Sequence, residues 1–134
     1  MSDRRHVVGF LVAGILATTG DAVAYAALLT IGWTHDPAKA ASFVVGALIS
    51  FTLNRRFTFR SQGALHREAV AFSALYAVTF LLNVGVNHVG VALLVPSLDH
   101  LGSSLAFLAA TAASTVANFL GQRLWVFTPS RPPP

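Results

Sequence analysis

Four long apolar runs dominate the chain, and only short polar breaks separate them. They cover residues 7–33, 38–57, 69–95 and 101–125. A membrane-crossing helix needs about 20 mostly apolar residues, so each run is long enough to cross a bilayer once. We therefore predict an all-α membrane protein with four transmembrane helices.

The composition supports this fold class. Hydrophobic residues make up 54% of the chain and charged residues 10%, whereas a soluble domain usually has about 25% charged residues. The absence of cysteine excludes disulfides and thiol chemistry. The arginines cluster at the ends of apolar runs rather than along a soluble face, so we expect no nucleic-acid partner despite a net charge of +4.

The charges also predict an orientation. Lys39 alone falls on one side of a four-span arrangement. The arginines that fall on the other side are Arg4, Arg5, Arg55, Arg56, Arg60, Arg67, Arg123 and Arg131. Because Lys and Arg accumulate in cytoplasmic loops, both termini and the central loop are predicted to be cytoplasmic. A cleaved signal peptide is the competing interpretation of the first run, since Ala24-Tyr-Ala26 resembles a cleavage site.

A ten-residue motif closes the second and fourth runs. It reads Ser50-Phe-Thr-Leu-Asn-Arg-Arg-Phe-Thr-Phe59 in the first copy and Asn118-Phe-Leu-Gly-Gln-Arg-Leu-Trp-Val-Phe127 in the second. Aligned without gaps, the copies pair the following residues: Asn54 with Gln122, Arg55 with Arg123, and Phe57 with Trp125. The first and third runs align best at an offset of about 62, which pairs Asp21 with Asn83.

The repeat predicts the internal organisation. Each half enters and leaves the membrane on the same side, so the halves are parallel repeats related by an axis along the membrane normal. We predict a single domain, residues 1–134, built from two helical hairpins of about 7–59 and 69–127.

Polar and small residues recur on one face of each run. The second run carries Ser42, Gly46, Ser50 and Asn54 at four-residue intervals. The corresponding sets in the other runs are Gly14, Thr18, Asp21 and Tyr25; Tyr76, Phe80, Asn83 and Asn87; and Ala110, Ser114, Asn118 and Gln122. Close packing and hydrogen bonding between helices is the simpler interpretation, and ligand binding the alternative for the asparagines.

Asp21 is unusual because it lies about midway along an apolar run, where a carboxylate is costly unless it is paired or protonated. Three interpretations remain open. Asp21 could pair with an arginine, stay protonated and bond a neighbouring helix, or titrate or contact a substrate during transport.

The motif arginines suggest a phosphate site. Arginines at the cytoplasmic end of a span also satisfy the charge bias and bind lipid phosphates unspecifically. However, Arg55 and Arg123 each follow an amide residue and precede an aromatic ring by two positions, in both repeats. The guanidinium fork holds phosphate with two hydrogen bonds, and the ring can stack on the guanidinium or on a sugar. Arg56 is a weaker candidate because its repeat partner is Leu124.

Other chemistry finds no support in the residues. The five histidines, His6, His35, His66, His88 and His100, have no helix-face spacing with a carboxylate that would suit a metal. No nucleophile, Walker or dinucleotide-binding motif is present. We expect no catalytic residue, no metal and no cofactor.

With these features the chain resembles the GtrA-like family of small bacterial membrane proteins, over nearly its whole length. The resemblance rests on residues 10–21 and on the two motif copies. Family members usually have tryptophan or a similar aromatic residue where Phe57 stands, and often asparagine where Gln122 stands. The resemblance implies a non-enzymatic role in cell-envelope polysaccharide synthesis or glycosylation, in the bacterial cytoplasmic membrane. The implied partners are a polyprenyl-phosphate-linked sugar, membrane lipids and a glycosyltransferase.

Three functions follow from this resemblance and from the residues. The leading hypothesis is a flippase without its own energy source for a polyprenyl-phosphate-linked monosaccharide. Arg55 and Arg123, helped by Asn54 and Gln122, would hold the phosphate. Phe57 and Trp125 would border that site, with Arg56 nearby. The sugar hydroxyls would meet Asp21, Asn83, Asn87 and Asn118.

The alternatives are an adaptor that recruits or stabilises a glycosyltransferase without transport, and a small proton-coupled cation exporter. Four short helices enclose little interior, so a homo-oligomer is also expected.

Overall fold

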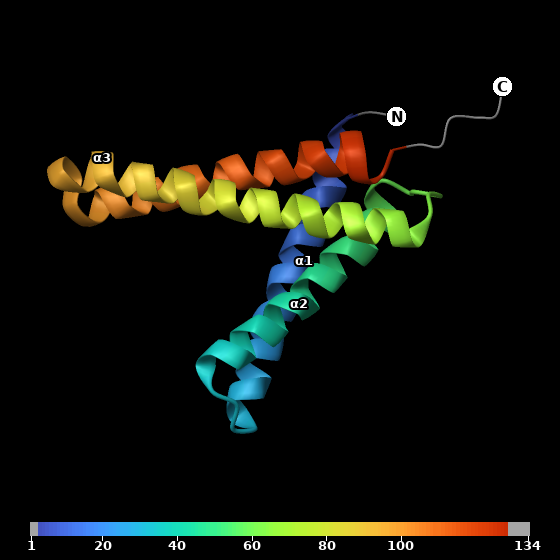
Figure 1. The fold of residues 1–134 in the computed structure, drawn as a ribbon, viewed down its shortest axis with the longest axis horizontal. Coiled ribbons are helices and arrows are strands. Elements are labelled where there is room, and N and C mark those ends of the chain that lie inside the picture. The colour runs from blue at the N-terminus through green and yellow to red at the C-terminus, as the bar shows by residue number, and fades with distance from the viewer. Residues whose placement is uncertain (1–2, 129–134) are drawn as a thin grey trace. The chain divides into compact units, whose positions relative to one another are not determined.

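The computed structural model describes residues 3–128, apart from the side chain of Asp36, and this part of the chain is helical without any strand. The elements in order are α1 (Asp3–Thr30), α2 (His35–Leu53), η1 (Asn54–Thr58), α3 (Leu65–Gly121) and η2 (Gln122–Val126) (Figure 1). Contacts divide the chain into two compact units, Met1–Gln62 and Gly63–Pro134. We call them hairpin 1 and hairpin 2 and describe each by itself. Arg131, one of the arginines behind the orientation prediction, lies outside the described residues.

Hairpin 1 consists of α1 and α2 lying antiparallel, joined by a short turn (Figure 1). The turn depends on Gly32, whose φ of +100° is a conformation that residues with a Cβ rarely adopt. The backbone N–H groups of Gly32 and Trp33 donate to the carbonyls of Leu29 and Leu28 at 3.1 and 3.0 Å, which closes the end of α1. Pro37 falls in the first turn of α2, where its missing N–H breaks no helical bond.

Hairpin 2 is α3 folded back on itself, followed by η2 (Figure 1). The reversal occurs at Asp99, which has φ 51° and ψ −126° inside the α3 bounds. The sequence predicts a break over 96–100 between the third and fourth runs. The break in the structure is shorter, because Pro96 lies inside α3 and only Asp99 departs from helical φ and ψ. Gly102 makes the tight return possible: a Cβ there would lie 2.6 Å from the carbonyl carbon and oxygen of Leu94.

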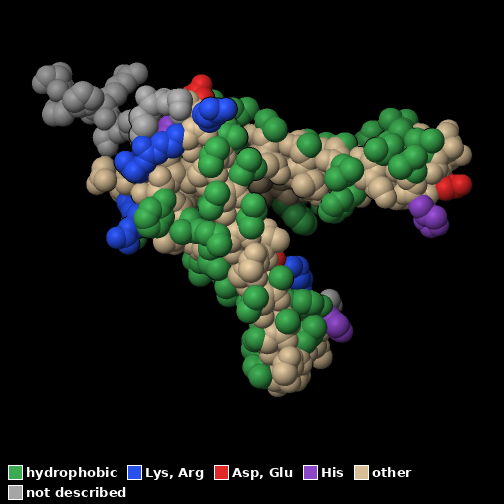
Figure 2. Space-filling model, turned by 180° about the vertical axis from the view of Figure 1, so that it is seen from behind, with side chains coloured by type: hydrophobic (Ala, Val, Ile, Leu, Met, Phe, Trp, Pro, Cys, Tyr) green, Lys and Arg blue, Asp and Glu red, His purple; other side chains and the backbone are tan. Residues whose placement is uncertain are grey.

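Small residues line the seam within each hairpin. Ala13, Ala17 and Ala38 in hairpin 1, and Ala71, Ala106 and Ala110 in hairpin 2, are at most 8% exposed. Large apolar side chains face outward instead, and Figure 2 shows hydrophobic side chains spread along both visible arms, with few charged side chains among them. Close approach through small residues with an apolar exterior is the pattern of helices packed in lipid.

Within residues 3–128, three helices are long and apolar enough to cross a membrane: Asp3–Thr30, Pro37–Thr58 and Leu65–Val126. The chain is therefore an all-α integral membrane protein with several apolar helices, as the sequence predicts. The third candidate has 62 residues, about three times the length that a bilayer requires. Its reversal at Asp99 leaves two arms that are each long enough to cross. Four crossings and cytoplasmic termini stay predictions.

Candidate functional site

Both copies of the sequence motif end in the same uncommon backbone geometry. η1 and η2 are five-residue π-helices, and they begin at Asn54 and Gln122, the paired amide residues. The N–H of Phe59 donates to the Asn54 carbonyl, and that of Phe127 to the Gln122 carbonyl, both at 2.8 Å. Bonds from residue i+5 to residue i are rare and are frequently found at functional sites. We call these two segments the π-turns.

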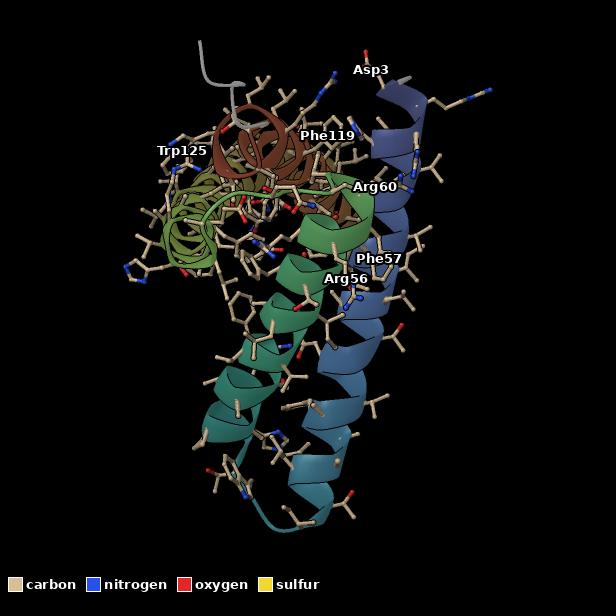
Figure 3. All side chains as sticks on the ribbon, turned by 90° about the vertical axis from the view of Figure 1, so that its right-hand side faces the viewer. Asp3, Arg56, Phe57, Arg60, Phe119 and Trp125 are labelled. Carbon is tan, nitrogen blue, oxygen red and sulfur yellow. The ribbon has the colours of Figure 1, made fainter. Side chains whose placement is uncertain are left out.

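Each π-turn sorts its side chains in the same way. The amides of Asn54 and Gln122 are fully buried. The arginines that follow them, Arg55 and Arg123, are half-buried. The rings two places further on are exposed, Phe57 by 61% and Trp125 by 46%. Figure 3 shows Phe57 and Trp125 at the ends of their helices. Amide, guanidinium and ring thus run from the interior of each π-turn to its surface.

The buried amides have more hydrogen-bonding capacity than their surroundings use. Asn54 Nδ2 donates to Ser50 Oγ at 3.2 Å. Within residues 3–128, however, Asn54 Oδ1 and both polar atoms of the Gln122 side chain have no hydrogen-bond partner. Each such buried group costs about 1–3 kcal/mol, and unsatisfied groups of this kind in native proteins often have a functional reason.

Arg56 occupies the outer side of the first π-turn. It is exposed, and its guanidinium carbon lies 5.7 Å from the centre of the Phe57 ring, a cation–π distance (Figure 3). Leu124, the equivalent residue in the second π-turn, is 68% exposed. The two π-turns therefore differ in charge on their outer side.

A groove of about 600 Å³ runs along hairpin 1 beside its π-turn. Most of its lining is apolar, and the polar part comes from Thr58 and from Arg4 and Arg5 at the start of α1. The lining residues are Arg4, Arg5, Val8, Gly9, Val12, Ala13, Leu16, Leu53, Phe57 and Thr58. An apolar groove with cations at one end suits a hydrocarbon chain that carries an anionic group. In hairpin 2, a second groove of about 610 Å³ has an apolar lining from Leu81 to Ala109, away from the π-turn.

Asp21 is paired, but not with an arginine. Lys39 Nζ lies 3.0 Å from Asp21 Oδ1 and 2.8 Å from Oδ2, so the ammonium of α2 bridges both carboxylate oxygens of α1. The prediction that Asp21 pairs with an arginine is therefore wrong, because its partner is Lys39. The ion pair also argues against a protonated Asp21. The helices meet closely here, since a Cβ on Gly46 would lie 3.1 Å from Asp21 Cβ.

Further polar groups surround this ion pair. The ammonium of Lys39 lies 5.7 Å from the centre of the Tyr25 ring. The Tyr25 hydroxyl and His35 Nδ1 share a hydrogen bond of 2.7 Å. Ser42 Oγ donates to the Lys39 carbonyl at 3.1 Å. The sequence pattern predicts that Tyr25 lies beside Asp21. It does not indicate that Lys39 and His35 join them, because these residues lie on the facing helix near its start.

Hairpin 2 has neutral pairs at the corresponding level. Asn83 Nδ2 donates to Ser114 Oγ at 3.0 Å, and Thr79 Oγ1 donates to Asn118 Oδ1 at 2.9 Å. These are the hydrogen bonds between helices that form the simpler interpretation of Asn83 and Asn118. Asn87 is half-buried one turn from Asn83. Ligand binding by these asparagines stays a prediction.

The expected helix faces are correct for α2 and shifted for α1. Ser42, Gly46, Ser50 and Asn54 are all buried. On α1, by contrast, Thr18 is exposed and a Cβ on Gly14 would meet nothing within 4 Å, so Gly14 does not mediate packing within the described part. Phe80 of α3 is likewise 62% exposed. Alanines at 13 and 17 form the α1 seam instead, and alanine carries no polar signal in a sequence.

Comparison with known proteins gives one family match. The model of the family described as "GtrA/DPMS, transmembrane domain" matches residues 9–127. The chain is similar to the "Uncharacterized membrane protein YngA" of Bacillus subtilis (strain 168), with 31% identity over 123 residues. That alignment covers 88% of this chain and 76% of the relative. No solved structure matches the chain. The matched range includes both π-turns and the Asp21–Lys39 pair.

Proposed function

Because the chain belongs to the GtrA/DPMS transmembrane-domain family, we propose that it moves a polyprenyl-phosphate-linked monosaccharide across the bacterial cytoplasmic membrane, for cell-envelope polysaccharide synthesis or glycosylation. The role is non-catalytic: the protein provides a polar path for the headgroup, and net movement follows the gradient of the lipid-linked sugar.

The proposal includes a topology. Hairpins 1 and 2 are the two repeats of one domain, each crosses the membrane twice, and both π-turns face the cytoplasm with both termini. The reversal of α3 at Asp99 supports two crossings in hairpin 2. In hairpin 1, the arginines of the π-turn and Lys39 lie near opposite ends of α2 and η1, which supports the orientation drawn from charge.

The observation that carries the proposal is the repeated π-turn. In both repeats an arginine stands between a buried amide and an exposed ring, at the start of the same rare backbone geometry. Arg55 and Arg123 bind the lipid phosphate, since guanidinium pairs with phosphate through two parallel hydrogen bonds. Asn54 and Gln122 precede the arginines in the chain and are buried, and their spare polar atoms become satisfied when the π-turn adapts to ligand. Phe57 and Trp125 border the phosphate.

The rest of the lipid follows from the same geometry. The prenyl chain lies in the apolar groove of hairpin 1, where Arg4 and Arg5 add cationic charge beside the π-turn. Arg56 does not line the groove, but its guanidinium lies over the Phe57 ring, which does. The polar seams within the hairpins offer hydrogen bonds to the sugar hydroxyls. The residues that serve this role are Asp21, Asn83, Asn87 and Asn118.

The test uses liposomes that contain only this protein and a polyprenyl-phosphate monosaccharide. Arg55→Ala combined with Arg123→Ala is expected to reduce movement of the lipid by at least about tenfold, because each arginine makes charge-assisted hydrogen bonds. Arg56→Leu is a matched control, since the second repeat carries Leu124 at that position, and it is expected to cause a smaller loss. Full movement by a folded double variant would refute the phosphate site.

The same experiment addresses the other functions. Folded protein that binds the lipid and a glycosyltransferase but moves no lipid would be an adaptor for that enzyme. A cation exporter fits less well, because Lys39 already neutralises the Asp21 carboxylate that would have to bind the cation. The small interior of each hairpin further suggests that a homo-oligomer is the working unit, and cross-linking in the same liposomes tests this.

A further inference from the structure

Lys39 is the only lysine in the chain, and it forms an ion pair with Asp21 within hairpin 1. The pair is open to its surroundings: the Lys39 side chain is 57% exposed and that of Asp21 20%. The ammonium therefore has donors to spare, because three N–H groups meet one carboxylate. A pair with this exposure can exchange one anion for another.

The surroundings hold Lys39 in place from several sides. Asp21 and Tyr25 come from α1, four residues apart and thus on one helix face, and they contact the ammonium through a carboxylate and a ring. The Tyr25 hydroxyl is fixed by His35 from the start of α2. Carboxylate, phenol and imidazole together are groups that bind sugar hydroxyls, and they surround a cation.

We propose that Lys39 receives the phosphate of the lipid-linked sugar at the outer end of hairpin 1, where the phosphate displaces the Asp21 carboxylate from the ammonium. This inference rests on the proposed movement of a phosphate-linked lipid. Phosphate oxygens and carboxylate oxygens bind an ammonium in the same way, so one anion replaces the other and the ammonium stays paired. The displaced Asp21 carboxylate is then hydrated, because its side chain is 20% exposed. No covalent bond forms or breaks.

The exchange also explains how the lipid leaves. A phosphodiester on an isolated buried lysine would be held tightly, whereas Asp21 competes for the same ammonium and returns when the lipid departs. Transport sites must bind well enough to admit a ligand and weakly enough to release it. Hairpin 2 lacks such a device at the matching level, because Asn83 and Ser114 form a neutral pair there.

The first test uses the single lysine as its own probe. A water-soluble amine-reactive reagent is added from outside to vesicles that contain the whole protein, and mass spectrometry measures modification of the Lys39 peptide. Short-chain polyprenyl phosphate is expected to slow this modification about tenfold, since an ammonium bound to phosphate does not react. The matching uncharged polyprenol is expected to give no protection. Equal protection by both lipids, or by neither, would overturn the proposal.

Asp21→Asn sharpens this test, because it removes the competing anion without changing the shape of the side chain. Half-maximal protection of Lys39 is then expected at an about tenfold lower concentration of polyprenyl phosphate. An unchanged or higher concentration would mean that Asp21 does not compete with phosphate.

Transport measurements separate this role from that of a purely structural ion pair. Lys39→Arg is expected to keep lipid movement, and Lys39→Gln to lose about tenfold. The double variant Asp21→Asn with Lys39→Gln serves as the folding control, because it buries no unpaired charge. The exchanged pair, Asp21→Lys with Lys39→Asp, restores an ion pair but moves the cation. Full transport by the exchanged pair would show that only the ion pair matters, and would overturn the proposal.

Failure of this inference and failure of the proposed function give different results. If Arg55 and Arg123 are required for movement while Lys39→Gln moves lipid normally, the outer site is wrong and the flippase stands. If wild-type protein moves no lipid but phosphate still protects Lys39 selectively, the outer phosphate site stands and the transport function falls.

Discussion

The two hairpins share one scaffold and differ in the chemistry along their seams. Each hairpin packs two antiparallel helical arms through alanines and ends in a π-turn that starts at a buried amide. At the level where α1 carries Asp21 and α3 carries Asn83, hairpin 1 has an exposed ion pair to Lys39, while hairpin 2 has a neutral bond to Ser114. The cationic groove likewise lies beside the π-turn of hairpin 1, and the groove of hairpin 2 is apolar and lies elsewhere.

This difference suggests a division of work between the repeats. The parts that agree, the π-turns with their arginines and rings, are those that we assign to the phosphate. The parts that differ would have different roles. Hairpin 1 provides the Asp21–Lys39 ion pair and the groove for the lipid chain, and hairpin 2 provides neutral hydrogen bonds.

The largest expected effect concerns the two hairpin turns. Gly102→Ala would place a Cβ 2.6 Å from backbone atoms of Leu94. Because backbone cannot move aside, we expect the free energy of unfolding to fall by about 3 kcal/mol. Gly32→Ala meets no neighbour within 4 Å but must adopt a φ of +100°, for which we expect a loss of about 1–2 kcal/mol. Thermal unfolding in detergent, followed by circular dichroism, measures both.

Gly85→Ala is the matched control for the turn variants. It lies in α3 with nothing within 4 Å of an added Cβ, and alanine is favoured over glycine by up to about 1 kcal/mol in a helix. A Gly102→Ala protein as stable as Gly85→Ala would contradict the tight return at Asp99.

The buried amides come next in expected size. Both polar atoms of Gln122 lack partners within the described chain, so Gln122→Met should raise the free energy of unfolding by about 1–2 kcal/mol. Asn54→Leu should raise the free energy of unfolding by a smaller amount, because this substitution also removes the hydrogen bond from Asn54 to Ser50. If the amides serve the phosphate site, both variants should move less lipid while being at least as stable, the usual trade-off at a functional site. A destabilised Gln122→Met would show that its polar atoms are satisfied.

The sequence predicts the helical hairpins and the repeated motif well, because they depend on local patterns. The apolar runs, the short polar breaks between them and the motif can all be recognised in the sequence. The π-turns are not, since no residue type distinguishes a bond to residue i+5 from one to residue i+4. Only the repeat of the motif indicates that Asn54 and Gln122 occupy equivalent positions in the two hairpins.

The partner of Asp21 could not be predicted for a different reason. The choice between Lys39 and an arginine depends on the register of α2 against α1, and that register is set by Gly46 and the α1 alanines, which allow close approach. Lys39 stands near the start of α2, where the charge count marks it only as the exception to the positive-inside bias.

A smaller effect is expected in the coupling energies of the two interhelical pairs, Asp21 with Lys39 in hairpin 1 and Asn83 with Ser114 in hairpin 2. A double-mutant cycle of Asp21→Asn and Lys39→Gln is expected to give about 1 kcal/mol, as the pair is partly exposed. A cycle of Asn83→Ala and Ser114→Ala is expected to give about 0.6 kcal/mol, the mean for hydrogen bonds between membrane helices. The cycles are measured by unfolding in detergent. Equal coupling in both hairpins would contradict the chemical difference between them.

The smallest effect on stability is expected at the exposed rings, where surface substitutions usually change the free energy of unfolding by no more than about 0.5 kcal/mol. Phe57→Ala and Trp125→Ala should therefore unfold like wild type. Their lipid affinities should nevertheless differ, because Phe57 lines the cationic groove of hairpin 1 and Trp125 does not line the groove of hairpin 2. Native mass spectrometry with polyprenyl phosphate should show the larger loss for Phe57→Ala. An equal loss for both would mean that the rings act only at the repeated π-turns, and that the groove of hairpin 1 does not hold the prenyl chain.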